Sequence, residues 1–345
     1  MKKFDINSFA RENIRKLKPY SSARDEFQGE ASVYLDANEN PFNSAYNRYP
    51  DPHQKKVKDA ISHIKGIQPE QLFLGNGSDE AIDLLIRAFC CPGKDNVVIP
   101  QPTYGMYSVS ADINDVEIRT CSLTKDFDID IEALQQTWND NSRLLFLCSP
   151  NNPSGNVLSE QKVRTVLEKF KGIVIIDEAY IDFTNSKGYS AWLNEFKNLA
   201  ILQTLSKAWG LAGIRLGMCI ANTDLIAILD KIKPPYNINT MTQEVALQAL
   251  ENRSRKETWV KEIIEEREFL KERLAKLNAA LQVYPSDANF LLVKVTHAKE
   301  IYQDLVKKGI IVRDRSNVML CDECIRITVG AKEENRILIE ALEKL

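Results

Sequence analysis

The chain has 345 residues, more than a typical single domain, so two domains or one large domain with a smaller companion are expected. Hydrophobic residues make up 44% and charged residues 27%, a balance that excludes a disordered or collagen-like chain. With 45 basic and 48 acidic residues, the formal charge of −3 gives no electrostatic reason to bind nucleic acid or an anionic membrane.

The N-terminal residues do not have the pattern of a secretory signal, because Asp5, Arg11 and Glu12 interrupt any apolar stretch. No uncharged apolar run approaches the roughly 20 residues that span a bilayer. The 7 cysteines, an odd number without framework spacing, predict free thiols in a reducing compartment. We therefore expect a cytoplasmic protein. Cys321 and Cys324 have the spacing of a zinc pair, but no second pair matches, so no metal is expected and their role stays open.

Short apolar runs alternate with longer amphipathic segments from about residue 70 to residue 220. A helix is predicted over 80–89, where apolar residues recur at helical spacing, and another over 159–170. Continuous apolar strands separated by such helices indicate a sheet covered on both faces, the α/β, mostly parallel arrangement. The predicted strands are 96–100, 143–148, 172–177, 199–204 and 218–221.

A second, smaller α+β domain is predicted after Pro234 and Pro235, which break the chain. A long helical region follows over 241–277, and then a helix at 298–308 flanked by strands at 289–295 and 325–329. The expected division is an N-terminal segment (1–40) packing with the small domain, a large domain (41–240), and the small domain with its linking helix (241–345).

Polar residues follow several of the predicted strands, as in Ser149–Asn152, Asp177–Glu178 and Ser206–Lys207. In open α/β sheets ligands bind just beyond the carboxyl ends of the strands. These residues are therefore predicted to converge on one site.

Lys207 is the candidate nucleophile of that site. A lysine among apolar neighbours is desolvated, so its pKa falls and its neutral amine becomes reactive. Ser206 and Arg215 flank it in the sequence, and a hydroxyl with a guanidinium suits a phosphate. The alternative is an ordinary surface lysine at the end of a strand.

Two further motifs have both a functional and an ordinary interpretation. The segment from Gly75 to Glu80, which includes Ser78 and Asp79, precedes an amphipathic helix whose N-terminal N–H groups favour a phosphate, or it is simply a capped helix. Asp177 ends an apolar strand, where a carboxylate is unfavourable unless it meets a cation. It could keep the ring nitrogen of a pyridine cofactor protonated, or it could cap a helix.

Together these motifs resemble the fold-type I pyridoxal phosphate (PLP) aminotransferases over nearly the whole chain. The resemblance implies a three-layer PLP domain with a mostly parallel sheet, and a covalent Schiff-base role for Lys207. One departure is Ser154, where the family usually has threonine. The remaining residues that the resemblance assigns to the cofactor are Ser206 and Arg215 for the phosphate, Ser78 and Asp79 for the amide cradle, Asp177 for the pyridinium, Tyr180 and Asn152 for the phenolic oxygen, and Tyr104 for ring stacking.

Within that superfamily the chain is most similar to the histidinol-phosphate aminotransferase family. The similarity lies in segments 17–24, 35–41, 47–52 and 312–315, the last followed by 325–330. It implies reversible transamination between L-histidinol phosphate and 2-oxoglutarate, giving imidazole-acetol phosphate and glutamate, in histidine biosynthesis.

The substrate residues implied by this resemblance are Arg313 and Arg326, whose guanidinium groups suit a phosphate and carboxylates. Tyr20 and Asn38 would add hydrogen bonds. The resemblance also implies a homodimer in which Tyr49 reaches the cofactor phosphate of the other subunit. Arg326 pairing with a surface acid, and Tyr20 as ordinary packing, are the alternatives.

Three related functions compete with this interpretation. An aromatic amino acid aminotransferase and a threonine-phosphate decarboxylase share the cofactor motifs, and fold does not settle substrate. A PLP-binding transcription regulator would carry an added DNA-binding module. The core motifs begin by about residue 17 with no basic helix-turn-helix before them, which disfavours that third function.

Overall fold

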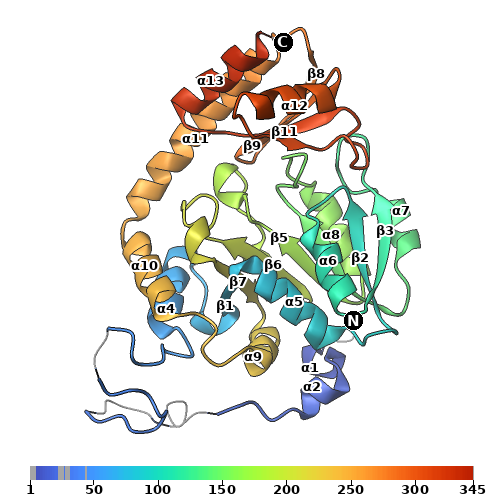
Figure 1. Cartoon of the computed structure of the whole chain (residues 1–345). Helices are drawn as coiled ribbons and strands as arrows, with labels where there is room; N and C mark the ends of the chain where they lie inside the picture. Colours follow the sequence, from blue (N-terminus) through green and yellow to red (C-terminus); the bar gives the residue numbers. More distant parts are fainter. Residues whose placement is uncertain (1–4, 22–26, 28–31, 43–44, 345) are drawn as a thin grey trace.

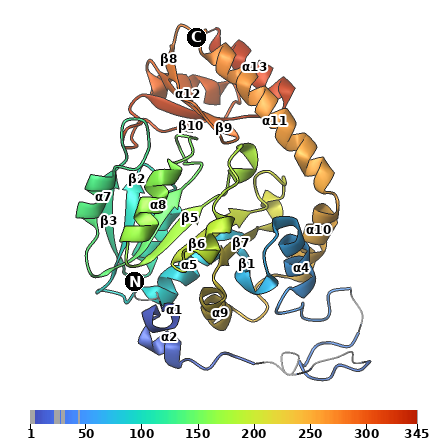
Figure 2. The same ribbon diagram turned by 180° about the vertical axis from the view of Figure 1, so that it is seen from behind.

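The computed structural model describes residues 5–21, 27, 32–42 and 45–344. The chain forms a large unit around a seven-stranded sheet and a smaller unit around a four-stranded sheet (Figure 1). Seen from behind, a long helix still runs along one side of the molecule and joins the two units (Figure 2). The described residues 5–21 lie below the large unit, at the end opposite the small one.

The large sheet has the strand order β1-β7-β6-β5-β4-β2-β3, and only β7 runs antiparallel to its neighbours. This confirms the predicted α/β, mostly parallel class. Two strands were not predicted: β1, which leads directly into the glycine-containing turn, and β3, an edge strand whose side chains are largely exposed. The strands are β1 (Leu72–Asn76), β2 (Asn96–Gln101), β3 (Glu117–Ser122), β4 (Ser142–Cys148), β5 (Ile173–Asp177), β6 (Leu199–Thr204) and β7 (Leu216–Ala221).

Helices cover both faces of this sheet, which explains its continuous apolar strands. In β1, Leu72 and Leu74 join one apolar cluster while Phe73, between them, joins the other. The first cluster is completed by α4 (Lys55–Lys65), α7 (Ile131–Thr137), α8 (Glu160–Lys169) and α10 (Thr240–Glu251). The second is completed by α5 (Gly77–Phe89), α6 (Met106–Ile113) and α9 (Thr223–Ile232). Short 3-10 turns lie at Pro69–Gln71, Ile181–Phe183, Ser190–Asn194 and Ala212–Ile214.

The helical region predicted over 241–277 is two helices, α10 and α11 (Arg253–Leu274). They are separated at Asn252, whose backbone leaves the helical region at φ −100° and ψ 41°. Leu270 and Leu274 of α11 are buried in the core of the small unit, so this helix ties the two units together. The small sheet, in the order β10-β11-β9-β8, is antiparallel; its elements are β8 (Ala280–Val283), β9 (Phe290–Val295), α12 (Ala298–Lys307), β10 (Arg313–Asp314), β11 (Cys324–Thr328) and α13 (Lys332–Leu342).

The described N-terminal helices α1 (Ile6–Phe9) and α2 (Glu12–Lys16) differ from the predicted packing of residues 1–40 with the small domain. They lie on the large unit because the apolar side of α1 meets the end of α5 and α9. Arg143 lies over the Phe9 ring at 3.5 Å from its centroid, and Arg11 donates a hydrogen bond to the Arg87 carbonyl at 2.9 Å. The rest of the domain division stays a prediction.

All seven cysteines lie in described residues and carry free thiols. Cys321 and Cys324 are buried in a small apolar cluster with Leu123, Phe127 and Leu292. Among the helices that the structure describes, none combines the length and apolarity of a bilayer-spanning segment.

Candidate active site

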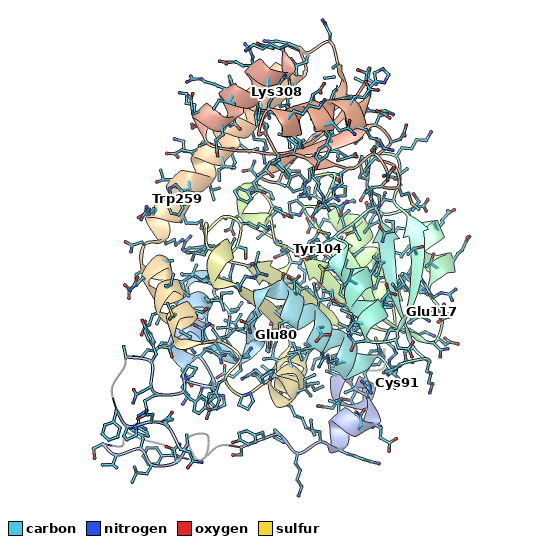
Figure 3. The ribbon with its side chains drawn as sticks, viewed as in Figure 1. Glu80, Cys91, Tyr104, Glu117, Trp259 and Lys308 are labelled. Carbon is cyan, nitrogen blue, oxygen red and sulfur yellow. The ribbon has the colours of Figure 1, made fainter. Side chains whose placement is uncertain are left out.

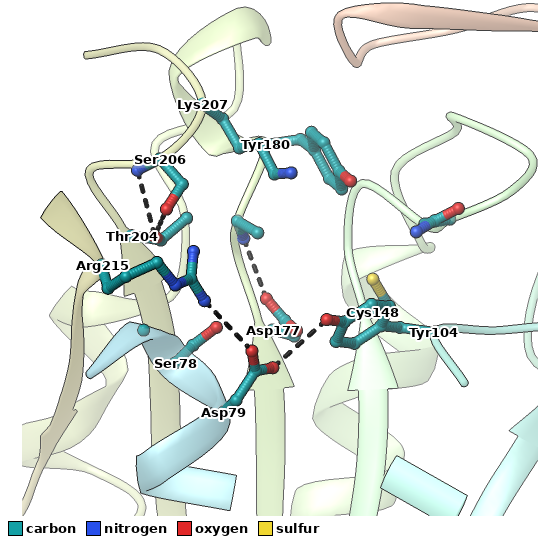
Figure 4. Close-up of a pocket in the computed structure, with 13 residues that line it drawn as sticks. Ser78, Asp79, Tyr104, Cys148, Asp177, Tyr180, Thr204, Ser206, Lys207 and Arg215 are labelled. Carbon is teal, nitrogen blue, oxygen red and sulfur yellow. Dashed lines mark hydrogen bonds and ion pairs between the residues drawn. The ribbon is translucent and has the colours of Figure 1, made fainter. Parts of the chain in front are cut away.

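A cavity lies where the carboxyl ends of β4, β5 and β6 meet the N-terminus of α5 (Figure 4). The parallel register places Cys148 beside Asp177, and Asp177 beside Leu202, so the residues that follow these strands converge. Tyr104 lies near the middle of the molecule, below the small unit (Figure 3). The cavity is lined by Gly77, Ser78, Asp79, Tyr104, Cys148, Asn152, Asp177, Ala179, Tyr180, Thr204, Ser206, Lys207 and Arg215.

Lys207 follows β6 and faces the cavity, with its Nζ atom 5.7 Å from the centroid of the Tyr180 ring. The residue keeps solvent-accessible surface, but partial burial still lowers the pKa of its amine, and the positive charges of Arg326 and Arg215 act in the same direction. Asp177 and Asp79 oppose this shift. The neutral amine, which can act as nucleophile or base, is therefore more populated than in an ordinary lysine.

An anion cradle forms at the N-terminus of α5. Gly77 has a φ of +72°, and a Cβ atom there would lie 2.7 Å from the Nη2 atom of Arg215. A Cβ atom on Gly217 of β7 would lie 2.1 Å from the backbone nitrogen of Ser78, so this close approach requires glycine. Arg215 also forms a weak ion pair with Asp79 at 3.4 Å. Helix N–H groups beside a guanidinium and the Ser206 hydroxyl form a site that suits a phosphate.

Asp177 is only 3% exposed, and burial raises the pKa of its carboxyl group to about 6. Two donors partly offset this effect: the Tyr107 hydroxyl at 2.7 Å from Oδ2 and the Ala179 N–H at 3.0 Å from Oδ1. Burying a carboxylate is unfavourable without a cationic partner. A protonated pyridine nitrogen would supply that partner, so these residues fit PLP.

The small unit contributes Arg326, whose Nη1 atom donates a hydrogen bond to Asn152 Oδ1 at 2.5 Å. The Nε atom of Arg326 is buried without a hydrogen-bond partner, and burial lowers the pKa of the guanidinium. Arg313 is the strand partner of Arg326 in the β10–β11 ladder. Arg315 is half-buried, and the charges of both arginines help to lower its pKa; the sequence analysis assigned no role to it.

Five predicted residues do not line this cavity within the chain: Tyr20, Asn38, Tyr49, Arg313 and Arg326, the last of which meets it only through Asn152. Tyr20 is 71% exposed, and Asn38 and Tyr49 line a separate hollow beside the start of α10. Tyr49 stacks on Tyr236, with ring centroids 4.5 Å apart and 16° between the ring planes. The motif at 17–24 lies partly outside the described residues, which exclude 22–24.

The structure also places residues at the site that the sequence analysis did not select, including Tyr107, Cys148 and Thr204. Thr204 Oγ1 accepts a hydrogen bond from the Ser206 N–H at 3.1 Å and so holds the turn that carries Lys207. Helical spacing gave no signal for Tyr107, because Tyr104 precedes α6 and does not share the helix with it.

Comparison with known proteins identifies the family of the chain. The family model described as aminotransferase class I and II matches residues 31–342. Histidinol-phosphate aminotransferases of Cytophaga hutchinsonii and Parabacteroides distasonis are 52% and 54% identical to the chain, each over 99% of both sequences. The crystal structure of the histidinol-phosphate aminotransferase from Clostridium acetobutylicum has a TM-score of 0.79 at 26% identity, covering 86% of this chain and 90% of that chain. The chain therefore belongs to the class I and II aminotransferases and, within them, to the histidinol-phosphate aminotransferase family.

Proposed function

We propose that the chain transfers the amino group of L-histidinol phosphate to 2-oxoglutarate with PLP as its cofactor, giving imidazole-acetol phosphate and glutamate. The observation that carries the proposal is the cavity in which Lys207, Arg215 and the buried Asp177 meet. Relatives bearing that enzyme name, identical at about half of all positions over the full chain, support the choice of substrate.

In this proposal, different residues of the chain bind different parts of the cofactor. The N-terminus of α5, Ser206 and Arg215 hold its phosphate, Tyr104 stacks on its ring, and Asn152 with Tyr180 bonds its phenolic oxygen. Bound in this way, PLP supplies an electron sink for the bonds around the amino-bearing carbon of the substrate. Asp177 stabilises positive charge on the ring nitrogen, because its carboxylate is buried at the bottom of the cavity.

Lys207 then moves the proton of the reaction. Its lowered pKa lets the Nζ atom accept a proton from the amino-bearing carbon of histidinol phosphate and, in the second half of the reaction, donate a proton to the former keto carbon of 2-oxoglutarate. Tyr180 packs edge-on against Phe290, with ring centroids 5.1 Å apart, and burial raises the pKa of its hydroxyl. The hydroxyl of Tyr180 therefore stays a hydrogen-bond donor at neutral pH.

Arg326 and Arg313 are assigned to the anionic ends of both substrates, with Tyr20 and Asn38 adding hydrogen bonds. Arg326 suits this role because its Nε atom is buried and unsatisfied while its Nη1 atom is held by Asn152. A substrate carboxylate or phosphate would give that donor the partner it lacks.

Arg326→Ala is expected to raise the KM values of both substrates by about 10- to 100-fold, the effect of losing charge-assisted hydrogen bonds. Cofactor affinity should change much less, because Arg326 bonds one cofactor residue, Asn152, and acts on Lys207 and Tyr180 through its charge alone. Steady-state kinetics and cofactor titration measure the two effects. Arg273→Ala is the matched control, since Arg273 pairs with Glu343 on the surface of the same unit. Equal losses of substrate and cofactor affinity would assign Arg326 to the wrong ligand.

The proposed working form is a homodimer in the cytoplasm. Large apolar side chains of the N-terminal segment are exposed in the single chain, with Leu35 at 90% and Phe42 at 85%. A second copy of the chain would cover them, and the hollow holding Asn38 and Tyr49 would then face the partner's cavity. Free thiols throughout the chain support a reducing compartment.

Mixed dimers test whether Tyr49 acts across the interface. One chain would carry Tyr49→Ala and the other Lys207→Ala, with separate affinity tags so that only mixed dimers are purified. If Tyr49 serves the other subunit, one of the two sites is intact and about half of the unaltered activity returns. If Tyr49 serves its own chain, neither site is intact and the mixed dimer stays as inactive as the two parent variants.

The substrate assignment is tested by following products. Purified protein with PLP should form glutamate from histidinol phosphate and 2-oxoglutarate, with a much higher kcat/KM than with aromatic amino acids. Threonine phosphate is the second substrate to assay. Release of carbon dioxide from it, without transamination of histidinol phosphate, would replace the proposed activity by a decarboxylase.

A further inference from the structure

Tyr107 is a fully buried tyrosine in α6. The proposed function assigns it no part in binding the cofactor or the substrates. Its ring is 0% exposed and stacks on Phe146 of β4, with centroids 4.8 Å apart and 14° between the planes. The Tyr104 ring meets it edge-on, at 5.5 Å and 83°. A buried phenol requires a partner for its hydroxyl. Here that partner is the carboxylate of Asp177, at 2.7 Å.

The Tyr107 hydroxyl and the Ala179 N–H hold the two oxygens of Asp177 separately. The hydroxyl donates to Oδ2, and the N–H donates to Oδ1 at 3.0 Å. One donor on each oxygen fixes the rotation of the carboxylate plane. Hydrogen bonds to the charged form also favour that form. Of the groups that lower the pKa of Asp177 against the effect of burial, Tyr107 has the largest influence.

Toward the Asp177 carboxylate, Tyr107 acts as a hydrogen-bond donor. Burial and the neighbouring carboxylate raise its own pKa well above the ordinary value, so the hydroxyl keeps its proton at neutral pH. The other titratable groups that interact with Asp177 include Asp79 of α5, Lys207 after β6 and Cys148 at the end of β4, together with Tyr104, Glu178 and Tyr180. Asp79 raises the pKa of Asp177 and Lys207 lowers it, each less than the Tyr107 hydrogen bond does.

We propose that Tyr107 is a positioning residue of the transamination: its hydroxyl orients the Asp177 carboxylate and holds negative charge on it, so that Asp177 can keep the cofactor's ring nitrogen protonated. The inference rests on the proposed function only through cofactor binding, because it does not depend on which amino donor is used. A protein that bound PLP but ignored histidinol phosphate would still test it.

Tyr107→Phe is the test, because phenylalanine keeps the ring packing against Phe146 and removes one hydroxyl. The full-length protein would be loaded with PLP labelled with nitrogen-15 in the ring, and the nitrogen-15 chemical shift would be followed against pH. We expect the midpoint for loss of the ring proton to fall by about one pH unit. The kcat value should fall by about 10-fold with little change in KM.

Tyr189→Phe is the matched control, since Tyr189 is also buried but its hydroxyl interacts with Ser149 and not with Asp177. It should leave the midpoint unchanged. Adding Tyr107→Phe to an Asp177→Asn chain should lower kcat little further, because Tyr107 acts through Asp177. An unchanged midpoint in Tyr107→Phe, or a full additional loss of kcat in the double variant, would overturn the inference.

Discussion

Lys207→Ala is expected to lower the turnover of the aminotransferase by at least about 10⁴-fold, because one amine serves as both nucleophile and proton carrier. The fold should survive this change. The Lys207 side chain faces the cavity at its accessible side, and the apolar contacts of the neighbouring Ala208 and Trp209 remain. Activity assays combined with circular dichroism would separate loss of chemistry from loss of structure.

Borohydride reduction of the PLP-loaded protein, followed by peptide mapping, locates the reactive amine directly. The reduced adduct should lie on Lys207 and be absent from Lys207→Ala. Lys162→Ala provides a control with another lysine, whose Nζ atom binds Asp128 at 2.8 Å on the surface. It should keep both the adduct and the activity. An adduct on any other lysine would contradict the role assigned to Lys207.

Asp177→Asn is expected to have the second-largest effect, a fall in kcat of about 100-fold or more, since a neutral amide does not stabilise positive charge on the ring nitrogen. The amide still fits the site, because the Tyr107 hydroxyl can turn to accept a hydrogen bond from it. Steady-state kinetics at saturating substrate would measure the change. A kcat value within a few-fold of the unaltered enzyme would exclude Asp177 as the partner of the ring nitrogen.

The same substitution should stabilise the cofactor-free protein at neutral pH. Burial raises the pKa of Asp177 from 3.8 to about 6, so between these values the folded chain holds a proton that the unfolded chain has lost. The contribution of this group to stability therefore falls as pH rises from about 4 to about 6. Asp177→Asn removes this loss of folding free energy, which is about 3 kcal/mol.

Denaturant unfolding of the two cofactor-free chains across this pH range would test that prediction. The free energy of unfolding of Asp177→Asn, relative to that of the unaltered chain, should be little raised near pH 4. The difference should grow up to about pH 6 and then stay constant. Comparing the two chains cancels titrating groups that do not interact with Asp177. Glu178 does not cancel, because the Asp177 charge adds to burial in raising its pKa to about 7. An advantage that shrinks as pH rises would show that Asp177 is already stabilised in its charged form.

Much of the large sheet was predictable because its inner strands are buried on both faces. A strand such as β5 is then a continuous apolar run ending in a polar residue, a pattern visible without any tertiary information. The edge strand β3 lacks that pattern, since its side chains are largely exposed. The break between α10 and α11 at Asn252 was also hidden, because no proline or glycine marks it.

The candidate site also contains residues that could be selected from the sequence and contacts that could not. Lys207, Arg215 and Asp177 could be selected from the sequence because each follows or precedes an apolar strand within a few residues. Tyr107 could not be paired with Asp177 in this way, since the two residues lie 70 positions apart and meet only where α6 packs on the sheet. The bond from Arg326 to Asn152, across 174 positions, likewise depends on how the small unit sits over the large one.

The sequence by itself determined the α/β class, the cofactor and the enzyme family, and it singled out Lys207 as the candidate nucleophile, because these depend on local patterns of apolar runs and on residues within short motifs. Only the tertiary structure decided which donors hold the Asp177 carboxylate, which carbonyls and rings anchor the first helices on the large unit, and that Arg326 bonds Asn152 of the cavity lining. Such contacts join segments distant in the chain, and their distances follow from packing, which local sequence patterns do not specify.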